Sequence, residues 1–234
     1  DFDPDVVKAL VVSLDAPGPA RSDPARYLEH LHCATAEGTP TVAGVLFLGR
    51  APQRWLADAR VSAVRFPGRE VSGEFLDRVE IDGRLTDQIH GCEEFLARHL
   101  AAPSSVEGWE RREHGMPSEA LREAVMNALV HRDYRMAAQV RVGVFDDRVE
   151  IVSPGGLLNR LTIDSIRIGW ISQRRNPIIA SLLARLARPG RENLGIGIPE
   201  MSRRMRERGL PEPEFDVQGG HFRVILRTVP AAPR

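Results

Sequence analysis

The stretch from Met116 to Gly156 constrains the fold most, because it joins one amphipathic helix to two strands and a glycine turn. Pro117 suits a first helical turn, where its missing N–H costs nothing. Beyond it, apolar residues recur at helical spacing and form one continuous face: Ala120, Leu121, Ala124, Val125, Ala128 and Leu129. Beside this face, Glu123, Asn127 and His131 recur every four residues, so the helix also carries one polar stripe.

Two β-type runs follow this helix, Gln139–Phe145 and Arg148–Val152, and the short polar link between them predicts a hairpin. The second run ends in the turn Ser153-Pro154-Gly155-Gly156, which would present backbone N–H groups at a strand end. A carboxylate and a carboxamide on one helix, followed by such a turn, are compatible with a nucleotide cradle. Taken singly, the stripe is more often the solvated edge of a helix, and the turn is more often simply a turn.

The order of these pieces carries a resemblance to a known family. It rests on four strings in sequence order: EALREAVMNALVHRDY, DRVEIVSPGGLL, RRNPIIASLLARL and ENLGIGIPEMSRRMRERGLPEPEF. Together they resemble the divergent ATPase-like module of the GHKL superfamily, which includes gyrase, histidine kinases and MutL. More narrowly, the chain is similar to the C-terminal part of bacterial proteins described as RecG-like helicases or transcriptional regulators, usually preceded by an AlbA/Schlafen-type DNA-binding domain. The resemblance spans Pro117 to Phe215, and more loosely Thr39 to Gly68.

The resemblance implies ATP and Mg²⁺ as ligands. Glu123 and Asn127 match the helix on which the family carries its general base and its magnesium-bridging amide. A carboxylate can polarise a water for attack on the γ-phosphate, and an amide oxygen suits Mg²⁺. The two glycine boxes of the family fall at four positions of this chain: Gly155, Gly156, Gly195 and Gly197.

Two departures from the family pattern weaken the expectation of catalysis. The aspartate that reads the adenine amino group is absent, and Ser153-Pro154 stand in its neighbourhood. The segment between the glycine boxes also lacks the glycine-rich character of the active ATPases' lid. We therefore expect a weak ATPase at most. A packing role for Gly195 and Gly197 is an equal alternative.

Composition narrows the class of protein further. The chain has 234 residues and a formal net charge of zero, so no whole-chain field selects nucleic acid or membrane. Its two cysteines, Cys33 and Cys92, do not suggest a disulfide framework or a zinc site. No apolar run approaches the roughly 20 residues of a membrane span, so we expect a cytoplasmic protein without membrane contact. The chain opens on Asp1, as expected for a fragment or a processed protein.

The N-terminal part, residues 1–106, is expected to form a smaller α/β region that ends in the polar linker Ala101–Glu107. Its predicted helices are Asp5–Ser13, Pro24–Thr35 and Leu85–Leu100, with a helical turn at Ala51–Leu56. Its predicted strands are Thr39–Leu48, Arg60–Phe66 and Phe75–Ile81.

The C-terminal part, residues 107–234, is expected to be an α+β two-layer sandwich, with helices on one face of a mixed, largely antiparallel sheet. After the central stretch, the predicted helices are Leu161–Ile168, Asn176–Leu186 and Pro199–Arg208. The last strands, Glu214–Val217 and Phe222–Thr228, are expected to pair across Gly219-Gly220 as a closing hairpin.

Three functional hypotheses follow. The favoured one is a regulatory, nucleotide-binding-like part of a DNA-binding transcriptional regulator; the others are a ligand-free structural or dimerisation scaffold and an active ATPase. The chain contains no G-x-x-x-x-G-K-[ST] phosphate loop, which argues against a helicase motor. DNA would be read mainly by a domain absent from this chain, and a homodimer is a further expectation. Between Ile171 and Gly209, nine arginines face three glutamates, an excess of six positive charges that favours either weak DNA-backbone contact or solvated helix faces.

Overall fold

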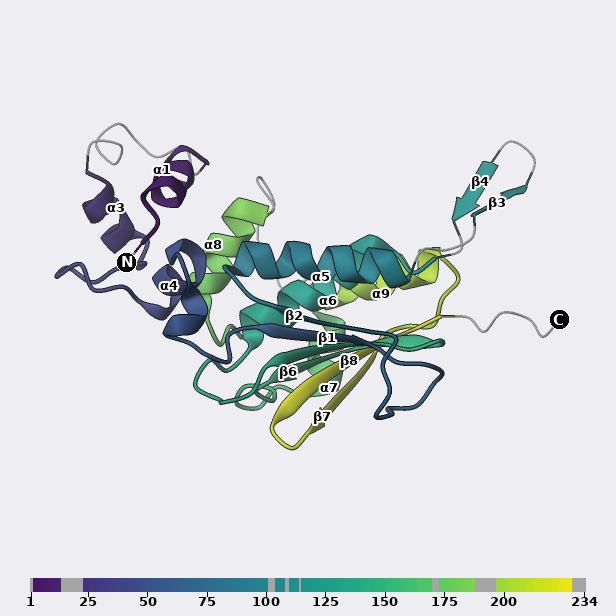
Figure 1. The fold of residues 1–234 in the computed structure, drawn as a ribbon. Coiled ribbons are helices and arrows are strands. Elements are labelled where there is room, and N and C mark those ends of the chain that lie inside the picture. Colours follow the sequence, from purple (N-terminus) through teal and green to yellow (C-terminus); the bar gives the residue numbers. More distant parts are fainter. Residues whose placement is uncertain are drawn as a thin grey trace.

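A computed structural model describes residues 2–13, 23–100, 104–107, 110–113, 115–169, 173–187 and 197–228. Its centre is a six-stranded sheet with the strand order β2-β1-β5-β6-β8-β7. Three helices, α5, α6 and α9, lie side by side over one face of this sheet (Figure 1). The predicted α+β two-layer sandwich is therefore confirmed.

The strands of this sheet come from both parts of the chain: β1 Val61–Arg65, β2 Asp77–Ile81, β5 Val140–Val144, β6 Arg148–Pro154, β7 Glu214–Gln218 and β8 His221–Arg227. Only β1 and β5 pair in parallel, whereas the other neighbours are antiparallel. The predicted hairpins β5–β6 and β7–β8 both form. Because β1 and β2 precede residue 107, the N-terminal part adds two strands to the sheet of the C-terminal part. The division at residue 106 stays a prediction.

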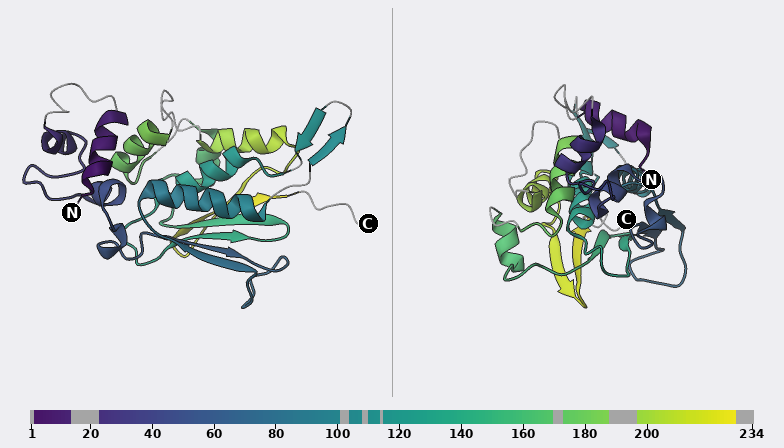
Figure 2. Two further views of the ribbon diagram at one scale, coloured as in Figure 1. Left: turned by 45° about the horizontal axis from the view of Figure 1, so that its top comes forward. Right: turned by 90° about the vertical axis from the view of Figure 1, so that its left-hand side faces the viewer.

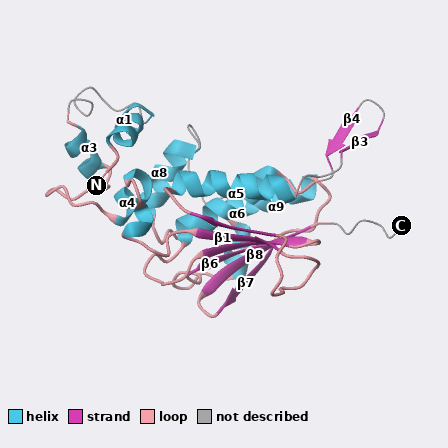
Figure 3. Ribbon diagram, in the orientation of Figure 1, coloured by secondary structure: helices cyan, strands magenta, loops and turns pink. Residues whose placement is uncertain are grey.

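The described helices are α1 Pro4–Ser13, α3 Pro24–His30, α4 Val42–Leu48, the short 3₁₀ helix η1 Pro52–Arg54, α5 Leu85–His99, α6 Ser118–His131, α7 Ile163–Ile168, α8 Pro177–Ala187 and α9 Gly197–Glu207. Apart from α4 and the end of α3, they lie close to the predicted positions. Figure 2 shows the sheet, the helical layer and the N-terminal helices from two further directions, and Figure 3 separates helices from strands by colour. None of the helices among the described residues is long and apolar enough to cross a membrane.

The predicted strand Thr39–Leu48 is wrong, because most of it forms helix α4. The Thr41 side chain caps this helix by accepting a hydrogen bond from the Gly44 amide at 3.1 Å. The run Val42–Leu48 is apolar throughout, and such a run has the same pattern in a buried helix as in a buried strand. Here Ala43, Leu46, Phe47 and Leu48 are all buried, so the run packs more than one side of a helix into the core.

Two boundaries also differ from the sequence prediction. Helix α3 ends at His30 rather than Thr35, because His32 adopts a left-handed backbone conformation with φ of 55°. Within the predicted linker Ala101–Glu107, residues 104–107 form strand β3, which pairs with β4, Glu110–Glu113. Residues 101–103 lie outside the described part of the chain. The β3–β4 hairpin projects away from the sandwich (Figure 1).

The core lies between the sheet and the helical layer. Ala120, Ala124 and Leu129 of α6 are fully buried, as are Val144 and Val149 of the facing strands. The two cysteines are free thiols in the core, which confirms that they form no disulfide. Burial raises the pKa of the Cys33 thiol to about 11 and that of Cys92 to about 12, so both are inert packing groups at neutral pH.

Candidate functional site

Helix α6 places the Glu123 carboxylate beside the Asn127 amide. The two residues are one helical turn apart, and Asn127 Nδ2 donates a hydrogen bond to Glu123 Oε1 at 3.2 Å. Glu123 is only 7% exposed. A buried carboxylate is costly unless it is hydrogen-bonded or paired, so this glutamate is not the solvated edge of an amphipathic helix. The Glu123–Asn127 pair is thus held inside the fold.

Gly197 brings the start of helix α9 against this pair. A Cβ atom at position 197 would lie 2.0 Å from Glu123 Oε1 and 3.5 Å from Asn127 Nδ2. A side chain at this position would have to displace the Glu123 carboxylate or shift the start of α9. The N-terminus of a helix carries unpaired N–H groups and a partial positive charge that favour an anion. Three predicted site residues therefore meet here, whereas Gly195 lies outside the described residues.

The other predicted glycines, Gly155 and Gly156, serve the fold directly. Gly155 has a φ of 104°, a conformation that favours glycine, and its N–H donates to the Gly220 carbonyl at 2.8 Å. The Gly156 carbonyl accepts a hydrogen bond from Arg175 Nη2 at 2.8 Å. Gly155 lies against Asp133 and Arg175, and its N–H is engaged by Gly220, so the predicted role of these two glycines in binding a nucleotide stays a prediction.

Arg175 organises this second cluster, which we call the Arg175 clamp. Its Nε donates to the His131 carbonyl at 3.1 Å, its Nη1 reaches Asp133 Oδ2 at 3.3 Å, and its Nη2 reaches Gly156. The next residue, Asn176, donates to the Val130 and Arg132 carbonyls, both at 2.8 Å. Arg175 and Asn176 therefore satisfy two of the carbonyl groups that the end of α6 leaves without helical partners, those of His131 and Val130.

The sequence prediction missed this clamp. Its only sequence signal is the polar pair Arg175-Asn176 directly before the helix-starting Pro177. That pattern is ordinary for a helix start, and most partners of the two side chains lie more than forty residues earlier in the chain, with Gly156 nineteen residues earlier. Only the folded chain brings them together.

Electrostatics at the clamp are fixed by hydrogen bonds and burial. A hydrogen bond from Arg135, with help from Arg175, lowers the pKa of Asp133 to about 2. Burial lowers the pKa of His131, and the positive charges of Arg175 and Arg174 lower it further. At neutral pH, Asp133 is therefore ionised and His131 is neutral.

The two clusters lie along one helix. Asn127 and His131 are four residues apart on α6, a rise of about 6 Å along the axis. Between them, the Ser153 hydroxyl at the end of β6 donates to the Ala128 carbonyl at 2.7 Å. This hydrogen bond fixes the strand end that leads into the glycine turn against α6. The clamp and β6 thus position the helix that carries Glu123 and Asn127.

The donor set fits a magnesium ion that is held mainly by phosphate oxygens. In the parts of the chain that the structure describes, no group of three or more His, Cys, Asp or Glu side chains could hold a metal. Mg²⁺ in nucleotide sites commonly takes only one or two protein ligands, with phosphates and waters completing its coordination. Asn127 directs its amide nitrogen to Glu123, so its amide oxygen faces away from the carboxylate. That oxygen is the protein ligand that fits.

Several arginines of this segment pair with nearby carboxylates. On α9, Arg203 and Arg204 both pair with Glu200, and Arg203 also pairs with Glu207. Arg206 pairs with Glu212 at 3.1 Å. Arg175 belongs to the clamp, and Arg188 and Arg191 lie outside the described residues. The described part of this segment therefore resembles solvated, internally paired helix faces more than a groove for a DNA backbone.

The sheet with its layer of helices and the contact of Gly197 with the Glu123–Asn127 pair can be compared with known families. Residues 137–226 match the family described as "Putative ATP-dependent DNA helicase recG C-terminal", which supports an ATPase-like module. The match includes Gly155, Gly156 and Gly197 but begins after Glu123 and Asn127.

A solved structure shares the fold over nearly the whole chain. It is the crystal structure of the DIP2311 protein from Corynebacterium diphtheriae, with a TM-score of 0.75 and 24% sequence identity. The similarity covers 97% of this chain but only 45% of that chain. This chain therefore spans less than half the length of that relative. The search of curated proteins found no match.

Proposed function

We propose that this chain is a regulatory, nucleotide-binding module of the GHKL type, with little or no ATP hydrolysis, within a DNA-binding transcriptional regulator. The observation that carries the proposal is the meeting of Gly197 with the Glu123–Asn127 pair. It joins a helix N-terminus, which favours anions, to an amide oxygen that suits Mg²⁺. The ATPase-like family match over residues 137–226 supports the same class.

In this proposal each residue has a distinct role. The start of α9 at Gly197 receives the phosphates, and glycine keeps the backbone accessible to them. Asn127 contributes its amide oxygen to Mg²⁺, which would neutralise phosphate charge when bound. Glu123 is the candidate general base, and it is oriented by its hydrogen bond from Asn127.

Weak hydrolysis follows from how the surrounding groups are engaged. The aspartate with which the related family reads adenine is absent, and in its neighbourhood stands Ser153, which is buried and hydrogen-bonded to the Ala128 carbonyl. The neighbouring Asp133 is bound by Arg135 and Arg175. An adenine ring that is bound without hydrogen bonds to its amino group leaves the nucleotide poorly oriented for hydrolysis. We therefore assign binding and signalling, rather than turnover, to this site.

The test is a titration of the chain with a fluorescent ATP analogue, with and without Mg²⁺, followed by a phosphate-release assay. We expect Mg²⁺-dependent binding that weakens at least about tenfold in Asn127→Ala, because a metal ligand is lost. Gly197→Ala should also weaken binding, because its Cβ would crowd the start of α9, and Gly73→Ala is the matched control, because a Cβ at Gly73 meets no atom within 4 Å. We expect phosphate release close to background.

Two outcomes would replace this proposal. Turnover in the ordinary range of about 1–10³ s⁻¹, abolished by Glu123→Ala, would identify an active ATPase. No binding up to about 1 mM nucleotide would favour the ligand-free scaffold. DNA contact through a domain outside this chain, a homodimer and a cytoplasmic location complete the proposal, and full-length protein is needed to test them.

A further inference from the structure

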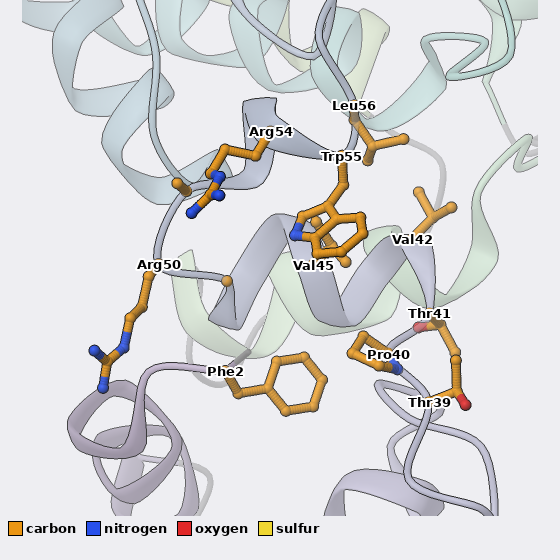
Figure 4. A pocket seen from close by; sticks show the side chains of 12 residues that line it. Phe2, Thr39, Pro40, Thr41, Val42, Val45, Arg50, Arg54, Trp55 and Leu56 are labelled. Atoms are coloured by element: carbon orange, nitrogen blue, oxygen red, sulfur yellow. The ribbon is translucent and has the colours of Figure 1, made fainter.

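A groove of about 1070 Å³ lies at the N-terminal end of the fold, formed by helix α4, the short helix η1 and the segment around Phe2. Figure 4 shows its side chains, with Trp55, Phe2 and Pro40 around one hollow and α4 behind them. Aliphatic side chains, Val42, Val45 and Leu56, complete the apolar lining. No residue of the ATPase-like site contributes to this groove.

The groove exposes an aromatic side chain whose backbone is held in place by hydrogen bonds. The Trp55 side chain is 71% exposed, and Val42 on α4 is 45% exposed. The backbone of Trp55 is fixed by its hydrogen bond to the Pro52 carbonyl at 3.0 Å. Gln53 anchors the same turn to the Ala59 and Gly83 carbonyls, at 2.7 and 2.8 Å. An apolar surface on a rigid support is the mark of a protein interaction site.

The charged side chains that line the groove are all positive. Arg50 and Arg54 line it, both are exposed, and no acidic side chain lines it. Among the described residues Arg54 forms no ion pair, whereas many arginines elsewhere pair with a carboxylate. The Asp3 carboxylate, which Arg50 influences through space, is paired with Arg84 at 2.6 Å. The groove is thus complementary to negative charge.

The chain itself shows the kind of segment this surface accepts. Phe2 forms an antiparallel bridge with Gly49, and the Asp3 amide donates to the Leu48 carbonyl at 2.8 Å. The Phe2 ring lines the groove while Asp3 pairs with Arg84. An extended segment with an apolar side chain next to a carboxylate is therefore already bound along one wall.

We propose that the Trp55 groove binds an acidic segment of a partner protein, with an apolar side chain against Trp55 and carboxylates at Arg50 and Arg54. A single-stranded nucleic acid is the less fitting occupant. Its sugar–phosphate backbone would have to lie over aliphatic side chains, and its bases would find one indole rather than a series of stacking rings. The apolar side chains of a peptide, by contrast, need no hydrogen bonds when they are buried in this groove. The forked guanidinium groups of the two arginines can each donate two hydrogen bonds to a carboxylate.

The test is to select, from a displayed library of short random peptides, those that bind the full chain, after removing peptides that also bind the Trp55→Ala variant. We expect the enriched peptides to carry an excess of Asp and Glu next to Phe, Leu or Trp. Their affinity should fall at least about tenfold in Trp55→Ala, because an exposed tryptophan in a groove is a typical hot spot. Arg50→Gln and Arg54→Gln should weaken binding and reduce its dependence on salt.

Ile168→Ala is the matched control, because Ile168 is 74% exposed and does not line the groove. Both variants replace exposed side chains, so equal melting temperatures would show that binding, not folding, changed. Enriched peptides without acidic residues, affinity that is unchanged in Trp55→Ala, or no enrichment at all would overturn the proposal. Binding of a labelled oligothymidine that depends on Trp55, without peptide binding, would reassign the groove to nucleic acid.

Discussion

Gly197 lies so close to Glu123 that a Cβ atom there would stand 2.0 Å from the carboxylate oxygen Oε1. Gly197→Ala must therefore displace a buried side chain or shift helix α9. We expect a loss of about 1–3 kcal/mol in the free energy of unfolding, the usual cost of overpacking. Urea denaturation of this variant checks the value.

The contact also predicts a coupling between the two residues. In Glu123→Ala the clashing oxygen is gone, so adding Gly197→Ala should cost clearly less than it does in the wild-type background. A double-mutant cycle measures this coupling, for which we expect about 1 kcal/mol or more. Strictly additive effects would show that Gly197 is required for another reason.

The Arg175 clamp is expected to stabilise the end of α6. Arg175→Lys keeps the charge but loses the fork that reaches His131, Asp133 and Gly156 together. We expect a loss of about 1.5–3 kcal/mol in the free energy of unfolding, in line with hydrogen bonds to charged groups. Arg185→Lys, an exposed arginine on α8, is the comparison and should change stability by less than about 0.5 kcal/mol.

The lowered pKa of His131 leads us to expect a loss of stability on mild acidification. Burial and the charges of Arg175 and Arg174 lower its pKa in the folded chain. Below the unfolded value of about 6.5, the unfolded state therefore binds a proton that the folded state does not, and stability falls as pH decreases. His131→Gln should reduce this fall between about pH 7 and 5. Equal pH profiles of the two proteins would contradict the assignment.

The N-cap of helix α4 leads to a prediction that distinguishes this helix from the strand expected from the sequence. The Thr41 hydroxyl accepts from the Gly44 amide and donates to the His32 carbonyl at 2.7 Å. Thr41→Ala should cost about 1 kcal/mol of unfolding free energy through loss of the cap, and Thr41→Ser should keep most of it. A strand at this position would show no such difference between the two variants.

The sequence by itself determined the elements whose periodicity is unambiguous. Helix α6 follows from its apolar face, and the hairpins β5–β6 and β7–β8 follow from β-type runs separated by short turns. The position of Glu123 beside Asn127 also follows from local geometry, because four residues make one helical turn. These features depend on neighbours along the chain, which the sequence contains directly.

The tertiary structure decided what depends on distant partners. The apolar run Val42–Leu48 suits either a helix or a strand, and its burial on more than one side, which decides for a helix, comes from the fold. Gly155 and Gly156 are predicted to bind a nucleotide from their order in the sequence, and only the fold shows that the Gly155 N–H donates to Gly220 and the Gly156 carbonyl accepts from Arg175. Hydrogen bonds and close contacts between remote segments are set by how the layers pack, and a local pattern does not encode which partner arrives.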